Sequence, residues 1–197
     1  MSTVDDRAPA RKLGPVCLVF GVMGLVASIA LTLEKLATLA DPGYIPSCSL
    51  NPVVTCGTVM ASPHAAVFGF PNPLLGIGGF AVVTTVGVIL LCGFRPPRWF
   101  QWGLQAGTTF GVVFVHWLIT MSLYDIHALC PYCLFVWVAV IPLFVGTTIE
   151  TLRRHAGTRR AAAVLTRVDA AIVVVWYVLI AGAVLNAFRD YWVSLVN

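Results

Sequence analysis

The stretch Cys130–Val145 reads CPYCLFVWVAVIPLFV, so that two cysteines lead directly into an apolar run that stays uncharged up to Ile149. A run of about 20 such residues is long enough to cross the hydrocarbon core of a bilayer as a helix. Pro131 suits the first position of a helix, because no backbone N–H is needed there. The stretch therefore predicts a membrane-spanning helix that begins at a pair of thiols.

The rest of the chain has the same character. Of its 197 residues, 59% are hydrophobic and 10% are charged, whereas soluble domains carry about 25% charged residues. This excludes an ordinary cytosolic enzyme and a nucleic-acid binder built on a basic patch. Spanning segments must be helices, because every backbone polar group has to be bonded inside the membrane. We predict one all-α membrane domain over residues 1–197, with spans at about 13–33, 71–94, 99–124, 126–149 and 170–188.

The basic residues predict the orientation of these spans. Of the twelve Lys and Arg residues, all but Lys35 and Arg189 fall on one side of the membrane, five of them in the connector 153–167. Loops rich in Lys and Arg stay in the cytoplasm, and such a basic loop touches anionic lipid. We therefore expect a multi-pass protein of the bacterial cytoplasmic membrane, with its N-terminus inside and its C-terminus outside.

Residues 37–70, between the first two spans, form a different kind of segment. Seven prolines and glycines interrupt it, and this density indicates loop and turn rather than a further span. Within it, residues 57–67 predict a short half-helix that is interrupted at Pro63. Because the segment is almost uncharged, we expect it to rest on the outer membrane face as a lid.

Six cysteines carry the candidate chemistry. In this orientation Cys17 and Cys92 lie near the cytoplasmic ends of their helices, and the other four lie on the outer side, where disulfides persist. The positive end of a helix stabilises a thiolate, so the CPYC pair is typical of a dithiol that cycles with a disulfide. The alternatives are a structural disulfide and a zinc site, although Cys48 and Cys56 are too far apart for the usual close ligand pair.

Cys48 and Cys56 have seven residues between them, in a segment without helical periodicity. Such a pair closes a small loop disulfide that we expect to stay mobile and accessible to another protein. Alone it is equally consistent with a structural role, but beside CPYC it indicates a shuttle for electrons from a soluble partner. The four histidines are scattered and show no haem or flavin signature. A quinone therefore fits best as the electron acceptor at the membrane surface.

At this point the motifs resemble those of the bacterial homologues of vitamin K epoxide reductase. The resemblance rests on Cys48–Cys56 (CSLNPVVTC), Ser62, Phe68–Gly76 (FGFPNPLLG) and Cys130–Cys133 (CPYC). It implies four helices bundled around a quinone, lidded by the half-helix, with a fifth helix as in the bacterial branch. It also implies roles for the cysteines. Cys133 attacks the quinone, Cys130 completes its disulfide, Cys56 exchanges with Cys130, and Cys48 faces the soluble partner.

At the helix cap we expect Cys130 to be the more exposed thiol of its pair, with Cys133 facing into the bundle. The resemblance further implies that Asn72 hydrogen-bonds a quinone oxygen, the alternative being an N-cap of the second span. Ser62 and Phe68 match positions around the pocket, the alternative being packing within the lid. Trp137 stands where the animal enzymes have a tyrosine that contacts the quinone, which favours quinone reduction over epoxide reduction.

The implied reaction is the generation of disulfides at the expense of a quinone, of the menaquinone (vitamin K) type or a ubiquinone. We expect the electron donor to be a separate, DsbA-like protein of thioredoxin fold on the outer side, because no fused thioredoxin-like domain fits into this chain. Two alternatives stay open: a reductase of vitamin K epoxide or quinone, and, from a different class, a non-enzymatic metal-binding membrane protein. We expect no metal site and no nucleic-acid partner.

Overall fold

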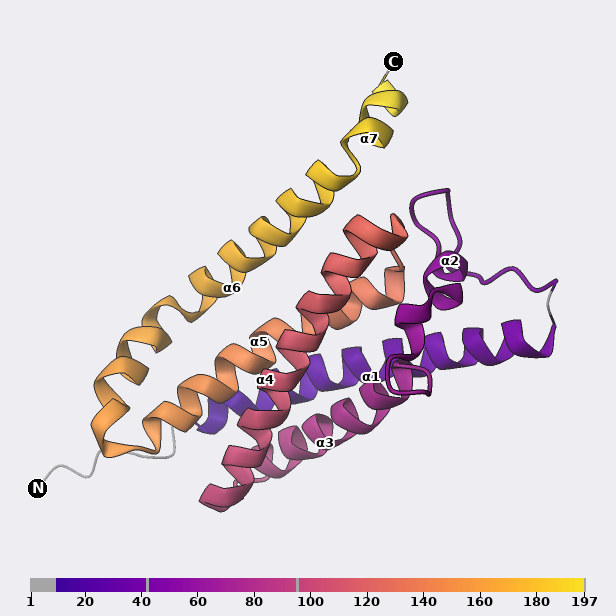
Figure 1. Ribbon diagram of the computed structural model, residues 1–197. Coiled ribbons are helices and arrows are strands. Elements are labelled where there is room, and N and C mark those ends of the chain that lie inside the picture. Colours follow the sequence, from indigo (N-terminus) through magenta and orange to yellow (C-terminus); the bar gives the residue numbers. More distant parts are fainter. Residues whose placement is uncertain (1–9, 42, 95, 197) are drawn as a thin grey trace, which may run out of the picture.

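The computed structural model describes residues 10–41, 43–94 and 96–196, and this part of the chain is helical apart from its connections (Figure 1). Within these described ranges, five helices are long and apolar enough to cross a membrane, which confirms the predicted fold class. They are α1 (Ala10–Ala40), α3 (Pro73–Leu91), α4 (Arg98–Met121), α5 (Pro131–Arg153) and α6 (Arg159–Ala187). Arg7 and Arg95, two of the basic residues behind the predicted orientation, lie outside the described residues.

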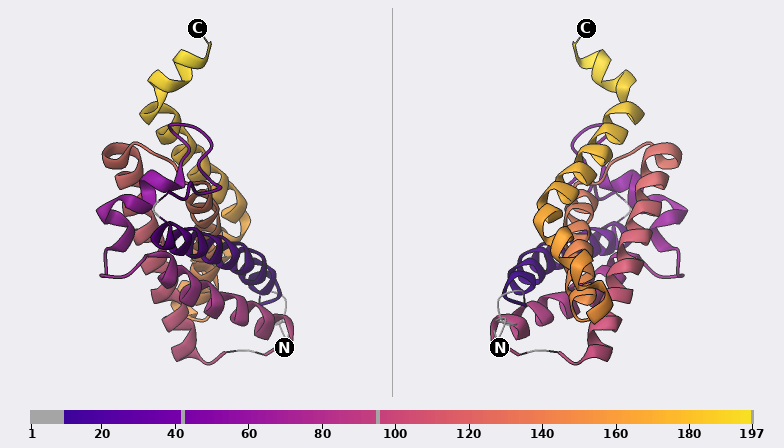
Figure 2. Two further views of the ribbon diagram at one scale, coloured as in Figure 1. Left: turned by 90° about the vertical axis from the view of Figure 1, so that its right-hand side faces the viewer. Right: turned by 90° about the vertical axis from the view of Figure 1, so that its left-hand side faces the viewer.

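Four of these helices, α1, α3, α4 and α5, form the bundle. α1 packs along α3 and α5, and α4 packs along α5 (Figures 1 and 2). α6 lies against α5 on one flank of the bundle and leads to the short helix α7 (Arg189–Val196). The most apolar window of α6 has no buried residue, which suits a helix that is surrounded by lipid.

The close approach of α1 and α3 depends on small residues. A Cβ atom at Gly87 would lie 2.5 Å from the backbone nitrogen of Leu18, so only glycine allows the two backbones to come this near. Small residues that let backbones approach are the usual basis of helix packing in membranes, where the contact has little hydrophobic driving force.

Several boundaries differ from the predicted spans, because helices continue past the hydrocarbon core. α1 extends to Ala40, so the loop begins about four residues later than predicted. α6 begins at Arg159, so most of the expected basic connector 153–167 is helical. A charge count finds the apolar core of a helix, whereas its ends depend on capping and packing.

The predicted start of the fourth span at residue 126 is wrong. A π-helical turn, η2 (Ser122–Ile126), continues α4, and His127 ends it in the left-handed conformation with φ 54°. The next three residues are not helical, and α5 begins at Pro131. Residues 127–130 are therefore a connection between spans, and Ile126 belongs to the end of the preceding helix.

The segment between α1 and α3 contains the predicted broken half-helix. It comprises α2 (Cys56–Ala61), an extended Ser62 and the 3-10 helix η1 (Pro63–Ala66). The interruption falls at Ser62–Pro63, because proline has no N–H with which to continue the helix. Residues 56–72, from α2 to the start of α3, are called the lid below.

Candidate functional site

A short backbone pairing joins the loop before the lid to the segment before α5. Val54 and Leu129 form an isolated parallel β-bridge. The Leu129 amide donates to the Val53 carbonyl at 2.7 Å, and the Thr55 amide donates to the Leu129 carbonyl at 2.8 Å. Cys56 follows Thr55 and Cys130 follows Leu129, so this bridge fixes the two cysteines beside each other.

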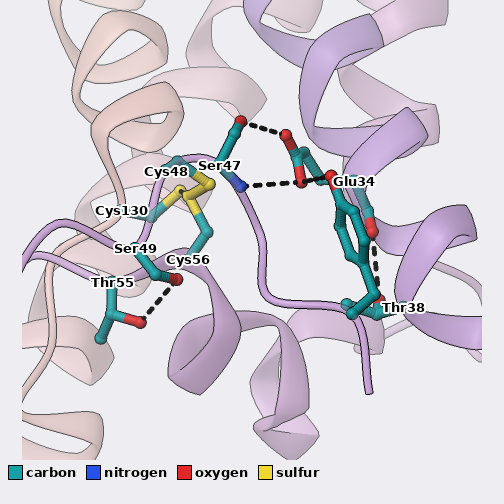
Figure 3. The surroundings of a disulfide bond; sticks show 9 residues. Glu34, Thr38, Ser47, Cys48, Ser49, Thr55, Cys56 and Cys130 are labelled. Atoms are coloured by element: carbon teal, nitrogen blue, oxygen red, sulfur yellow. Dashed lines mark hydrogen bonds between the residues drawn. A yellow bond between two sulfur atoms is a disulfide. The ribbon is translucent and has the colours of Figure 1, made fainter. Parts of the chain in front are cut away.

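The four cysteines of the two predicted pairs meet at this bridge. Cys48 and Cys56 form a disulfide, while Cys130 and Cys133 are free. The Sγ atom of Cys56 lies 3.1 Å from the Sγ atom of Cys130 (Figure 3). The structure thus contains an oxidised loop pair in direct sulfur contact with a reduced helix pair, which is the geometry that thiol–disulfide exchange requires.

Cys17 and Cys92 lie away from this cluster. Cys17 is buried within the bundle on α1, and Cys92 is exposed at the end of α3. Neither takes part in the sulfur contacts. Both residues lie toward the helix ends that are farther from the cluster of four cysteines, as expected.

Two expectations about exposure are wrong. The loop disulfide is not accessible, since Cys48 is 6% exposed and Cys56 is fully buried. Cys130 is 1% exposed and is the more buried thiol of its pair. The reason is that the loop pair packs directly over Cys130, whereas Cys133, one turn further into the bundle, borders a cavity.

Glu34, near the end of α1, holds the segment in front of Cys48. Its carboxylate accepts hydrogen bonds from the Tyr44 hydroxyl at 3.0 Å, from the Ser47 amide at 3.3 Å and from the Ser47 hydroxyl (Figure 3). Hydrogen bonds to an ionised carboxylate are stronger than neutral ones. The bond to Glu34 also raises the pKa of Tyr44. Glu34 is thus a clamp on the cysteine loop.

The sequence itself contains a signal for the role of Glu34 that the motifs above do not include. Beyond Arg11 and Lys12 at its start, α1 has only two charged residues, the adjacent Glu34 and Lys35 near its end, and such charges need partners. Lys35 finds one in the lid, because its ammonium donates to the Met60 carbonyl at 2.9 Å. The two residues therefore attach α1 to the loop and to the lid.

The electrostatics of the free pair favour a thiolate at the N-cap of α5. The pKa of Cys130 is lowered, chiefly by a hydrogen bond from the Cys133 thiol and also by the backbone amides of Cys133 and Tyr132. Burial and the nearby charge of Glu34 oppose this lowering. We predicted a thiolate stabilised at the helix start, and the structure places that effect on Cys130.

A cavity of about 550 Å³ lies inside the bundle beside the cysteines. Its walls come from α1, the lid, α3, α4 and α5, and they are mostly apolar. Both Cys130 and Cys133 reach this wall. A cavity of this size and polarity suits a ring-shaped apolar ligand held by a few polar groups, so the lining residues fit a quinone next to Cys133.

Three of the four predicted pocket residues line this cavity, and they are Ser62, Asn72 and Trp137. Phe68 does not line it. Phe68 is half exposed and packs against Phe110 and Phe114 of α4, with ring centroids 6.4 and 5.7 Å away. The aromatic side chain thus fastens the lid to α4, as the packing alternative predicted, and the assignment of Phe68 to the pocket wall is wrong.

The alternative role of Asn72 as a helix cap is also wrong. The residue occupies the N-cap position of α3 without a side-chain capping bond. Its amide nitrogen donates to the His64 carbonyl at 2.7 Å, and its side-chain oxygen accepts from the Val67 amide at 3.2 Å. Asn72 therefore ties η1 and the residues after it to the start of α3 at the edge of the cavity.

Across the described residues, no group of three or more His, Cys, Asp or Glu side chains is arranged to hold a metal ion. The polar side chains around the cavity carry hydroxyls, one amide, indole N–H groups, one lysine ammonium, one imidazole and the thiols.

Comparison with known proteins agrees with the site. A search of curated proteins finds no match. Residues 15–148 match the family described as the vitamin K epoxide reductase family, a span that contains all four clustered cysteines and the lid. Members of this family are thiol and quinone oxidoreductases, which in general use a quinone. On this match, which covers more than half of its length, the chain belongs to the vitamin K epoxide reductase family.

Proposed function

We propose that this protein is a quinone-dependent membrane oxidase that generates disulfides in proteins outside the cytoplasm. Electrons pass from a thioredoxin-fold dithiol protein through Cys48 and Cys56 to Cys130 and Cys133, and then to a quinone in the cavity. The observation that carries the proposal is the 3.1 Å contact between Cys56 and Cys130, because it links a loop disulfide to a dithiol that borders an apolar cavity.

The first exchange takes place at the loop. A thiolate of the donor attacks Cys48, Cys56 leaves as a thiolate, and the second donor thiol releases Cys48, so the donor is oxidised and the loop pair is reduced. The buried position of Cys48 requires the loop to open first. Opening breaks the hydrogen bonds of Ser47 and Tyr44 to Glu34, so docking of the donor has to replace them.

The second exchange transfers the electrons to α5. Cys56 attacks Cys130 in the oxidised Cys130–Cys133 pair and releases Cys133. Cys48 then attacks Cys56, which restores the loop disulfide and leaves Cys130 and Cys133 reduced. The structure has this last arrangement of bonds. The lowered pKa of Cys130 makes it a good leaving group in this step.

The third step takes place at the cavity wall. A bound quinone supplies an acceptor for two electrons and two protons. Cys133 borders the cavity and would deliver the electrons to a quinone bound there, while Cys130 would complete the new disulfide. Trp137 lies in the same wall with no protein partner for its indole N–H among the described residues, so this donor is free to meet a quinone oxygen. Asn72 and Ser62 add polar groups at the lid side.

The test uses purified full-length protein, a reduced thioredoxin-fold donor, and either menaquinone or ubiquinone. We expect loss of donor thiols in step with quinol formation, and no turnover in Cys133→Ala. The matched control is Cys92→Ala, an exposed cysteine outside the cluster, which retains turnover. Quinol formation with a small dithiol but not with the protein donor would contradict the proposed partner. Faster reduction of vitamin K epoxide than of quinone would favour the alternative role in quinone recycling.

A further inference from the structure

Reduction of a quinone requires protons as well as electrons, and the cavity offers few groups that carry them. Among the described residues of its lining, the ionisable side chains are Lys35, His64, Cys130 and Cys133. The ammonium of Lys35 is directed to the Met60 carbonyl. The two thiols supply the electrons. His64 is the remaining group, and histidine is the side chain whose charge changes most readily near neutral pH.

His64 lies in the lid at the boundary between the cavity and the surface. It belongs to η1, its backbone carbonyl is held by Asn72, and its ring packs on Trp117 of α4 with the centroids 5.6 Å apart. One quarter of its side chain is exposed. The ring is therefore fixed in place while it reaches both the cavity wall and the outside of the lid.

A carboxylate from another element stands behind this ring. The Nδ1 atom of His64 is buried and has no aligned hydrogen bond, yet it lies 3.5 Å from an Oδ2 atom of Asp125. Asp125 belongs to η2 at the end of α4, and its side chain is 63% exposed. The imidazole nitrogen is buried and without a partner, and the carboxylate beside it is exposed to water. A small movement of either side chain would therefore let a proton pass between them.

We propose that His64, supported by Asp125, carries protons between the outer water and the quinone cavity. This inference rests on the proposed function and adds a residue to its last step. As the Cys130–Cys133 disulfide forms, two electrons leave the pair, and its two thiol protons pass to water, that of Cys130 when its thiolate forms and that of Cys133 as the disulfide closes. The acceptor takes up the two electrons and two protons to become a quinol. His64 gives the acceptor one proton at a time and regains each proton from water through Asp125, so the imidazole is unchanged at the end. The two protons taken up by the quinone equal the two lost by the thiols.

His64→Asn tests this, with His127→Asn as the matched control, because His127 is an exposed histidine at the same end of the molecule and asparagine tolerates its left-handed backbone. We expect His64→Asn to slow quinol formation about 100-fold, the usual contribution of a positioned acid or base. Added imidazole should restore part of the rate. Asp125→Asn should slow the same step less, and His127→Asn should behave as the wild type.

Two further measurements separate a proton carrier from a support of the lid. Oxidation of the donor by pre-oxidised protein in the absence of quinone, followed by trapping of thiols, should proceed equally in His64→Asn and wild type. Quinone affinity, measured by quenching of tryptophan fluorescence, should also be unchanged. A His64→Asn variant with wild-type rates, or one that is equally slow without quinone, would overturn the inference. Wild-type protein that reduces no quinone would instead overturn the proposed function.

Discussion

The Sγ atoms of Cys56 and Cys130 lie 3.1 Å apart, although 74 positions separate the two residues in the chain. The β-bridge between Val54 and Leu129 produces this contact, because each cysteine lies within two residues of a bridged position. A single backbone pairing thus brings the loop disulfide into contact with the Cys130–Cys133 dithiol at the start of α5.

The order of exchange is tested by Cys48→Ala. This change removes the thiol that resolves the bridge between the loop and α5, so a Cys56–Cys130 disulfide should accumulate when the protein is oxidised. Non-reducing digestion with mass spectrometry should find the peptides of these two cysteines joined. The same digest of Cys17→Ala serves as the control and should show the bridge only in traces. A bridge from Cys56 to Cys133 would contradict the order.

The thiolate at the helix start depends on Cys133. In a background whose remaining cysteines are replaced, Cys133→Ala removes the hydrogen bond that is the main cause of the lowered pKa of Cys130. Burial then dominates, so the pKa of Cys130 should rise. The thiolate fraction at neutral pH should fall accordingly. A titration followed by the ultraviolet absorbance of the thiolate measures this.

Cys133→Ser is the conservative comparison, since its hydroxyl keeps a donor in place. Its titration should keep the pKa of Cys130 lowered. Equal pKa values in the alanine and serine variants would show that the helix end, rather than the Cys133 side chain, stabilises the thiolate.

The shape of the lid beside the cavity depends on Asn72. Asn72→Ala removes two hydrogen bonds, to His64 and Val67, each worth about 1 kcal/mol. A loss of about 1.4 kcal/mol corresponds to a tenfold loss of affinity. We therefore expect KM for quinone to rise about tenfold or more while both disulfides still form. Steady-state kinetics and thiol trapping check the two parts.

Asn51→Ala provides a comparison in the loop itself. The Asn51 side chain accepts from the amides of Val53 and Val54 and so shapes the segment that forms the β-bridge. Its loss should slow exchange between Cys56 and Cys130 and leave KM for quinone unaltered. The same pattern in both asparagine variants would mean that the lid and the loop act as one unit.

The packing of α1 on α3 makes a prediction about stability. Gly87→Ala would push a methyl group against the backbone of Leu18, and overpacking of this kind costs about 1–3 kcal/mol. Gly78, on the same helix, has no atom within 4 Å of an added Cβ. Gly78→Ala should be neutral or stabilising by up to about 1 kcal/mol, because alanine favours helix. Thermal unfolding in detergent compares the pair.

The expected orientation is tested with two exposed positions at opposite ends of the bundle. In a background without other accessible thiols, Ile45→Cys lies in the cysteine loop and Phe94→Cys lies between α3 and α4. A membrane-impermeant thiol reagent should label Ile45→Cys in intact spheroplasts and label Phe94→Cys only after lysis. The reverse pattern would place the cysteine cluster in the cytoplasm.

The sequence by itself determined the elements and the reactive groups of this protein. Uncharged runs of about 20 residues must be helical in a membrane, and this local requirement identified all five long helices. The two cysteine pairs and the break at Pro63 were equally readable, since each depends on neighbouring residues. The ends of the helices were harder to read from the sequence. The uncharged run after Asp125 resembles the start of a span, yet His127 turns the backbone away from the helix.

Only the tertiary structure decided how these parts meet. Burial of Cys130 beneath the loop, the clamp of Glu34 on Ser47, the displacement of Phe68 from the cavity wall and the approach of His64 to Asp125 all join residues from different elements. No periodicity encodes such contacts, because each depends on the packing of whole helices and on which polar groups remain unpaired once the bundle has closed. The positions of the thiols are therefore readable from the local sequence, whereas the contacts between them are a property of the fold.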